Sequence, residues 1–515
     1  MPTTELTPDR APVVVGERPL TIEDVIDLSR GKARAVLDAS PTYLARVERS
    51  HHLLTEASLL GKPIYGVNTG FGVSCEVGVD ADWMARMPIN LVRFHGCGVG
   101  EPLSVQDSAA VVAVRLASLA RGHSGVRVAL LQRFVDLLNN GIVPRIPSQG
   151  SVGASGDLTP LSYVAAVIMG EREAYYRGNL MPAGQALALA GLTPFVFEPK
   201  ESLAIMNGTS VMTALACAAI VSAERLCRLA AACTAMLCEV TNGNPSHFHE
   251  RIFALKPHPG QTLAARWIRD DLEGAPATNE GPRVQDRYSL RCAPHVIGVA
   301  LDTLTFVRQW VQTEINGVND NPILDPESGE VLMGGNFYGG HVGQAMDALK
   351  TAVASVCDLM DRQLLLLCDP QANGGLPRDL VAPVGAAATA NFGFKAMQIL
   401  TSALAAEALK LTMPATAFSR STEGHNQDKV SMGTIAARDC QSIVSLTETC
   451  AAALVLALCQ AVDVRCKSPV RVSTRALHKF VRQHIQAVDQ DRGMEADIHA
   501  VVRWLRNDEL PLGAP

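Results

Sequence analysis

The sequence predicts a mainly α-helical protein, with a loop-rich N-terminal region followed by a long helical bundle. Of its 515 residues 48% are hydrophobic, which supplies a large core. After residue 200, long stretches rich in Ala and Leu contain few helix breakers. These stretches predict helices over 203–240, 340–368, 385–412 and 431–464. We therefore expect two domains, 1–200 and 201–515.

The first helix is expected to begin at Thr21. Asp24 follows three residues later, in the arrangement of a capping box, and apolar residues then recur at helical spacing. The chain continues to residue 200 as helices separated by loops rich in Gly and Pro. The loops over 61–72, 94–102 and 141–160 carry the residues suspected of chemistry, as is usual when a rigid scaffold positions functional loops.

The second half contains an apolar stripe at helical spacing over 297–315. The long helices of this half are too apolar to be covered by a single layer of surface residues. We therefore expect a central bundle that is buried by neighbours, including other subunits.

Composition narrows the class of partner. The chain has 45 basic and 51 acidic residues and a net charge of −6, which favours neither nucleic acid nor an anionic membrane. Its 13 cysteines form no Cys-x-x-Cys pair, a pattern typical of a reducing cytoplasm. Residues 1–5 do not resemble a signal peptide, and the apolar run 451–459 is too short to span a bilayer. These features predict a cytoplasmic protein that acts on a small molecule.

The tripeptide Ala154-Ser155-Gly156 is able to form an electrophile from its own backbone. Attack of the Gly156 nitrogen on the Ala154 carbonyl carbon, followed by loss of two waters, leaves an exocyclic methylene on an imidazolone ring. Ala154 leaves its carbonyl uncrowded, Ser155 supplies the hydroxyl that is eliminated, and Gly156 reaches strained backbone angles. A serine-hydrolase elbow is disfavoured, because Asp157 stands where that motif requires a second Gly.

The residues around this tripeptide resemble a known signature. Residues 150–162 are similar to the segment that forms 4-methylideneimidazole-5-one (MIO) in aromatic amino acid ammonia-lyases and aminomutases. Further blocks resemble the same family in the same order, at 65–72, 207–209, 285–292, 335–337 and 425–428. The resemblance implies an architecture of the ammonia-lyase/fumarase-like superfamily and a homotetramer whose active sites draw residues from three chains. It also implies MIO as the cofactor, with no metal and no nucleotide.

The same resemblance assigns roles to individual residues. Tyr65 matches the catalytic base, and its phenol requires nearby positive charge or a helix N-terminus to ionise near neutral pH. Arg291 matches the arginine that grips the substrate carboxylate. Tyr288 matches a second active-site tyrosine, and Asn207 matches an asparagine that contacts MIO or the carboxylate. Three further positions are expected at the substrate: Gly72, Gln285 and Phe337.

Substrate choice depends on three positions. Phe94 and His95 match the selectivity pair, which the resemblance gives as Ser-His in histidine lyases, Phe-Leu in phenylalanine lyases and His-Leu in some tyrosine lyases. Gln427 stands where histidine lyases carry Glu. A pocket with a histidine and without a carboxylate suits a phenolic hydroxyl better than an imidazole or a plain phenyl ring.

We therefore expect an MIO-dependent ammonia-lyase that converts L-tyrosine to ammonia and p-coumarate, a phenylpropanoid acid. The amine becomes a better leaving group on the electrophile while a base removes the β-proton. Three alternatives remain open: a tyrosine 2,3-aminomutase, a histidine or phenylalanine ammonia-lyase, and an inactive paralogue that serves as a scaffold.

Overall fold

The computed structural model describes residues 10–272, 284–465 and 472–512. The chain forms two compact units, each built from three separate stretches of sequence. The first unit comprises Met1–Ala218, Arg308–Asp347 and Pro414–Arg438; the second comprises Ala219–Val307, Ala348–Met413 and Asp439–Pro515. The domain boundary expected at residue 200 stays a prediction.

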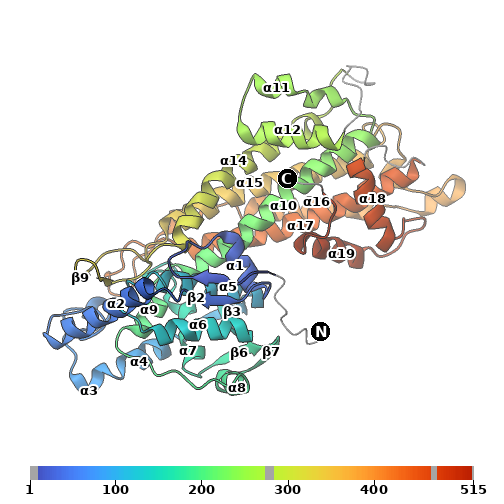
Figure 1. The fold of residues 1–515 in the computed structure, drawn as a ribbon. Helices are drawn as coiled ribbons and strands as arrows, with labels where there is room; N and C mark the ends of the chain where they lie inside the picture. Colours follow the sequence, from blue (N-terminus) through green and yellow to red (C-terminus); the bar gives the residue numbers. More distant parts are fainter. Residues whose placement is uncertain (1–9, 273–283, 466–471, 513–515) are drawn as a thin grey trace. The chain divides into compact units, whose positions relative to one another are not determined.

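The first unit begins with a strand, a helix and a second strand. β1 (Val13–Val15) pairs in parallel with β2 (Ala35–Leu37), and α1 (Ile22–Ser29) connects them. The capping box is confirmed, because the Thr21 side chain accepts from the Asp24 nitrogen and the Asp24 side chain accepts from the Thr21 nitrogen. The buried face of α1 packs on α5 (Val105–Leu119) (Figure 1).

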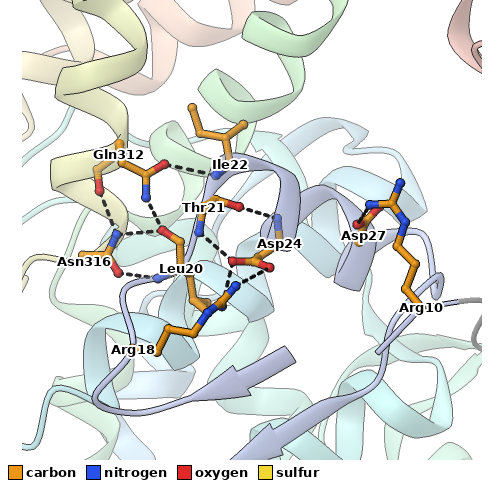
Figure 2. A network of polar contacts seen from close by, with 9 residues as sticks. All are labelled: Arg10, Arg18, Leu20, Thr21, Ile22, Asp24, Asp27, Gln312 and Asn316. Carbon is orange, nitrogen blue, oxygen red and sulfur yellow. Dashed lines mark hydrogen bonds and ion pairs between the residues drawn. The ribbon is translucent and has the colours of Figure 1, made fainter. Parts of the chain in front are cut away.

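Two side chains from far along the chain hold the entry to α1 (Figure 2). The Leu20 nitrogen donates to Asn316 Oδ1 at 2.8 Å, and Asn316 Nδ2 donates back to the Leu20 oxygen at 2.9 Å. The Ile22 nitrogen donates to Gln312 Oε1 at 3.2 Å. The N-terminal segment is thus fixed to residues almost 300 positions later, at the end of α14 (Ala293–Ile315).

Three helices of the first unit pack against one another around the loop that carries Ser155. They are α4 (Met87–Phe94), α7 (Leu158–Ile168) and α9 (Glu201–Met206). Short antiparallel sheets flank them: β3 (Val99–Pro102) with β5 (Pro147–Gln149), and β4 (Ile142–Pro144), β6 (Glu173–Tyr176) and β7 (Asn179–Pro182) in that order. The unit also contains α2 (Pro41–Leu59), α3 (Ala81–Met84), α6 (Val128–Asn140), α8 (Ala183–Leu189), and the hairpin of β8 (Ile323–Asp325) and β9 (Glu330–Leu332).

The long helices confirm the mainly α fold. They are α10 (Ser210–Val240), α14, α15 (Gly340–Cys368) and α17 (Gly433–Val464). Two predicted bounds are wrong. The expected helix over 203–240 is broken at Asn207, between α9 and α10. The helix expected over 385–412 is limited to α16 (Lys395–Lys410), because Gly385 and Gly393, at φ +63° and +51°, keep the preceding segment out of the α-helical conformation.

Polar side chains join the helices of the second unit. Gln363 Nε2 donates to Thr234 Oγ1 at 2.8 Å, and the Arg228 guanidinium makes two bonds to the Asp271 carboxylate at 2.8 and 3.0 Å. Arg228 lies on α10 and Asp271 ends α12 (Pro259–Asp271). The unit also includes α11 (Glu250–Ala254), α13 (Tyr288–Arg291), α18 (Val472–His484) and α19 (Glu495–Arg506). These buried bonds fix the order of helices that apolar packing alone leaves adjustable.

By length and composition alone, α10 and α17 are each able to cross a membrane. The run 451–459 was expected to be too short to span a bilayer. That expectation is corrected, because the run is part of the longer apolar helix α17. In the most apolar window of each helix, 72% and 78% of the residues are buried inside the protein, as in the core helices of soluble proteins. Such helices are therefore weak evidence for a membrane.

Candidate active site

Two cavities of the first unit meet at residues that the sequence singles out. The first has a volume of about 620 Å³ and the second about 490 Å³. The residues that line both are Tyr65, Gly72, Ala154, Ser155, Asn207 and Gln427. Segments more than 360 positions apart thus converge on Ser155, so we take this junction as the candidate active site.

The backbone around Ser155 adopts strained conformations. Ser155 has φ +49°, and Gly156 has φ +75°. A Cβ atom on Gly156 would lie 2.1 Å from the Gly208 oxygen, so this position accepts only glycine. The tight turn, the uncrowded Ala154 and the β-hydroxyl of Ser155 fit the precursor of MIO.

The side chain of Asp157 holds this turn in place through several hydrogen bonds. Its buried carboxylate accepts from the nitrogens of Val211 and Met212 at 3.0 and 2.9 Å, at the start of α10, and from Ser151 Oγ at 2.8 Å. Thr434 Oγ1 also donates to it. Burial raises the pKa of Asp157 although these bonds oppose the shift. One side chain thus ties the loop to two other segments, the start of α10 and the segment that contains Thr434.

Tyr65 lies at the junction of the cavities. Its hydroxyl oxygen accepts from the Gly72 nitrogen at 3.0 Å, and Gly72 reaches this position with φ +58°. Burial raises the pKa of Tyr65, the Glu423 carboxylate raises it further, and the bond from Gly72 opposes the shift. The expectation that positive charge or a helix N-terminus lowers this pKa is therefore wrong for the described chain, where a carboxylate is the neighbouring charge.

Glu423 is a site residue that the sequence reasoning missed. It lines the first cavity, and its two carboxylate oxygens accept from the Val73 nitrogen at 3.2 and 3.1 Å. The expectation of a pocket without a carboxylate is therefore wrong. The sequence offers one indication that Glu423 belongs to the site: it lies two residues before His425, in the same loop as Gln427.

His95 and Phe94 lie where the selectivity pair is expected, on the wall of the first cavity at the end of α4. His95 Nδ1 lies 3.0 Å from the Leu91 oxygen. Because a carbonyl oxygen only accepts, Nδ1 carries the proton and Nε2 is the acceptor in the neutral ring. Phe94 stacks beside the imidazole, with ring centroids 4.1 Å apart, and is 61% exposed.

Arg172 holds this wall in place through hydrogen bonds to α4 and α7. Its guanidinium donates to the Val92 oxygen at 2.6 Å and to Ser162 Oγ at 2.9 Å, and Ser162 Oγ lies 3.2 Å from the His95 oxygen. Burial lowers the pKa of His95, and the positive charge of Arg172 lowers it further against the bond to Leu91. The imidazole is therefore kept neutral, with Nε2 as a hydrogen-bond acceptor.

The remaining predicted residues divide between the two units. Gln427 Nε2 donates to Ser155 Oγ at 3.3 Å, and Phe337 lines the second cavity. The three predicted residues of the second unit contact one another, since Arg291 Nη2 donates to Gln285 Oε1 at 3.2 Å and its guanidinium lies 4.6 Å from the centre of the Tyr288 ring. None of these three is among the residues that line the two cavities, so their part in the site stays a prediction.

Comparison with known proteins places the chain in a family. Residues 20–483 match the model of the family described as aromatic amino acid lyase. A histidine ammonia-lyase of Aromatoleum aromaticum is 40% identical over 96% of this chain and 92% of its own length. The structure of a tyrosine aminomutase from Streptomyces globisporus superposes with a TM-score of 0.89 at 33% identity, over 97% of each chain. A phenylalanine aminomutase of Pantoea agglomerans superposes with the same TM-score at 29% identity, over 96% of this chain and 99% of its own.

The family match and the curated relatives identify an enzyme that breaks a carbon–nitrogen bond. The chain belongs to the aromatic amino acid ammonia-lyase and aminomutase family.

Proposed function

We propose that the protein is an MIO-dependent ammonia-lyase whose preferred substrate is L-tyrosine. The enzyme converts this substrate to p-coumarate and ammonia. The observation that carries the deamination is the strained turn at Ser155, which lies between two cavities and beside Tyr65. MIO, formed from Ala154, Ser155 and Gly156, supplies an electrophile that makes the substrate amine a better leaving group.

The remaining steps belong to side chains of this protein. Tyr65 is proposed to take the β-proton of the substrate as phenolate, a state to which the Gly72 nitrogen donates a hydrogen bond. Glu423 supplies negative charge near Tyr65 and is suited to hold the cationic amine of an incoming amino acid.

The choice of tyrosine rests on His95. Its Nε2 is an acceptor, so the ring of the substrate must bring a donor, and a plain phenyl ring leaves this atom unpaired at a cost of about 1–3 kcal/mol. A phenolic hydroxyl and an imidazole N–H both satisfy it. Phe94 and the neutral amide of Gln427 favour the phenol.

L-histidine is the second candidate, and two findings favour it. Eight curated relatives that match at least 94% of this chain are named histidine ammonia-lyase, at 34–40% identity. The Glu423 carboxylate also offers a charged partner for an imidazole ring. A tyrosine 2,3-aminomutase is a third candidate, supported by the name of the similar structure from Streptomyces globisporus.

One incubation separates these candidates. The purified enzyme is incubated separately with L-tyrosine, L-histidine and L-phenylalanine, and acrylate and β-amino acid products are separated and quantified. We expect p-coumarate from tyrosine as the main product. Turnover of histidine alone would reject tyrosine, and accumulation of β-tyrosine would identify an aminomutase.

We also propose a cytoplasmic homotetramer whose active sites are shared between subunits. Tyr288 is 71% exposed and lies with Arg291 in the second unit, as expected of residues supplied to another copy. Mixing inactive Tyr65→Phe and Arg291→Ala subunits should restore part of the activity, because some sites then receive both native residues. No recovery in mixed tetramers would contradict shared sites.

A further inference from the structure

The buried carboxylate of Asp320 bonds both ends of helix α9. Lys200 immediately precedes this helix and Asn207 immediately follows it. Lys200 Nζ donates to Asp320 Oδ2 at 2.6 Å, and Asn207 Nδ2 donates to Asp320 Oδ1 at 3.3 Å. The side chains of Lys200 and Asp320 are both 0% exposed. One carboxylate thus holds a six-residue helix at its start and at its end, where a residue of the candidate active site lies.

The surroundings make this carboxylate difficult to replace. Arg115 is also fully buried, and its Nη2 donates to the oxygens of Ala204, within α9, and Asn319 at 2.6 and 2.9 Å. Asp320 is the negative charge that stabilises both buried cations, Lys200 and Arg115. Lys200 itself is held at φ +74°, a strained conformation for a residue with a side chain.

The two acceptors at Asn207 Nδ2 fix which way the amide faces. Nδ2 donates to Asp320 Oδ1 and to the Asn321 oxygen, the latter at 2.9 Å. Both partners only accept, so Asn207 Oδ1 faces elsewhere. This oxygen is buried and has no hydrogen-bond partner among the described residues. An unpaired buried acceptor costs about 1–3 kcal/mol, which a purely structural asparagine avoids.

We propose that Asp320, held by Lys200, is a positioning residue for Asn207: it turns the amide so that Oδ1 is left to accept a hydrogen bond from an N–H group of the reacting amino acid. The inference rests on the proposed function, because the donor is the amine of that substrate. Asp320 itself lines neither cavity and acts through Asn207.

The test compares Asp320→Asn with the wild-type enzyme, using the aromatic amino acid that the wild type deaminates best. Turnover is divided by the near-ultraviolet absorbance of MIO, so that only mature sites are counted. We expect kcat per mature site to fall about tenfold to a hundredfold, as for a misplaced catalytic group, with KM changing less. A crystal structure of the variant should show the Asn207 amide displaced from the Asn321 oxygen.

Lys350→Met is the matched control. Lys350 is another buried lysine, in the second unit, where Nζ donates to the Met413 oxygen at 2.7 Å. Its loss should lower the melting temperature without changing kcat per mature site. An equal fall in kcat in this control would overturn the inference, because the effect would then be general destabilisation.

A second variant covers the case in which Asp320→Asn does not fold. Lys200→Met/Asp320→Asn removes both charges of the ion pair together, so Lys200 is not left buried without its partner, and Arg115 keeps its bonds to the Ala204 and Asn319 oxygens. It is expected to stay at least about tenfold below wild type in kcat per mature site. Wild-type kcat in either variant, or an unmoved Asn207 in the crystal structure, would overturn the inference. A wild-type enzyme without activity on any aromatic amino acid would instead reject the proposed function, while the crystal structure still reports on Asn207.

Discussion

The floor and the rim of the candidate active site differ in how firmly the surrounding structure holds them. The floor, formed by residues 154–157 and Asn207, is fixed by the buried carboxylates of Asp157 and Asp320. The rim, formed by Tyr65, Phe94, His95, Glu423 and Gln427, is partly exposed and held by few bonds. The groups that build the electrophile are therefore rigid, while the groups that face the substrate ring are free to vary. We therefore expect the rim, rather than the floor, to set which aromatic amino acid is accepted.

The largest expected effect comes from the floor. Ser155→Ala removes the hydroxyl that must be eliminated, so we expect turnover to fall at least about a thousandfold, roughly 4 kcal/mol of barrier. The variant should fold, because the floor is held by Asp157 rather than by Ser155. Activity and the near-ultraviolet difference spectrum check this, and near-normal turnover would reject the mechanism.

The next largest effect is expected at Tyr65, a rim residue that lines both cavities. Tyr65→Phe should keep the MIO absorbance and lower turnover by about 10² to 10⁴, the usual contribution of a general base. Because burial and Glu423 raise the pKa of Tyr65, the phenolate forms only as the pH rises, and kcat/KM should still increase above about pH 8. A rate that peaks below pH 7 would show that Tyr65 is not the base.

His95 tests the rim. His95→Leu removes the acceptor at Nε2, which should weaken tyrosine and relieve the penalty against phenylalanine. We expect the ratio of the two kcat/KM values to change by about tenfold to a few hundredfold, or roughly 1–3 kcal/mol for one buried hydrogen bond. An unchanged preference would remove His95 from substrate selection.

Substitution of Arg172 tests whether His95 depends on the positive charge of this neighbouring residue. Arg172→Gln removes the positive charge that lowers the pKa of His95, so this pKa should rise. His95 then protonates at a higher pH and loses its acceptor, and kcat/KM for tyrosine should begin to fall at a higher pH as the medium is acidified. Arg145→Gln, at an exposed pair with Glu173, is the control that should leave the profile unchanged.

The smallest effect is expected from Gln427→Glu. The new carboxylate lies beside Ser155 and near Glu423, and like charges placed together disfavour ionisation. We therefore expect only weak gain of histidine turnover, about tenfold or less in kcat/KM. A full switch to histidine, measured with the same substrate panel, would show that this single position sets the choice.

Much of the site was predictable because its residues lie in short, distinctive blocks. The Ala154-Ser155-Gly156 tripeptide and Tyr65 fall within loops that the sequence identifies, and both reach the junction of the cavities. Asp320 was not predictable, since an Asp in a loop reads as exposed until the fold buries it beside Lys200. Glu423 was missed for a similar reason: its approach to Val73 depends on a contact across 350 positions.

The fold was predictable where apolar periodicity is long and unbroken. The bounds of α15 agree with the pattern because residues 344–368 contain no Gly or Pro. The break at Asn207 was hidden, because one Gly within an apolar run does not reveal that Asp320 and Asp157 impose a turn there. Tertiary contacts thus decided the local structure where the chemistry lies.

The first unit is built from three separate stretches of sequence, so its parts are synthesised at different times. The turn at Ser155 leaves the ribosome long before residues 431–434, yet the Met432 nitrogen donates to the Val152 oxygen at 3.0 Å and Thr434 bonds Asp157. Until that late segment docks, the turn lacks two of the contacts that tighten it. We expect ring closure to follow translation, so that a nascent or prematurely terminated chain carries no reactive methylene.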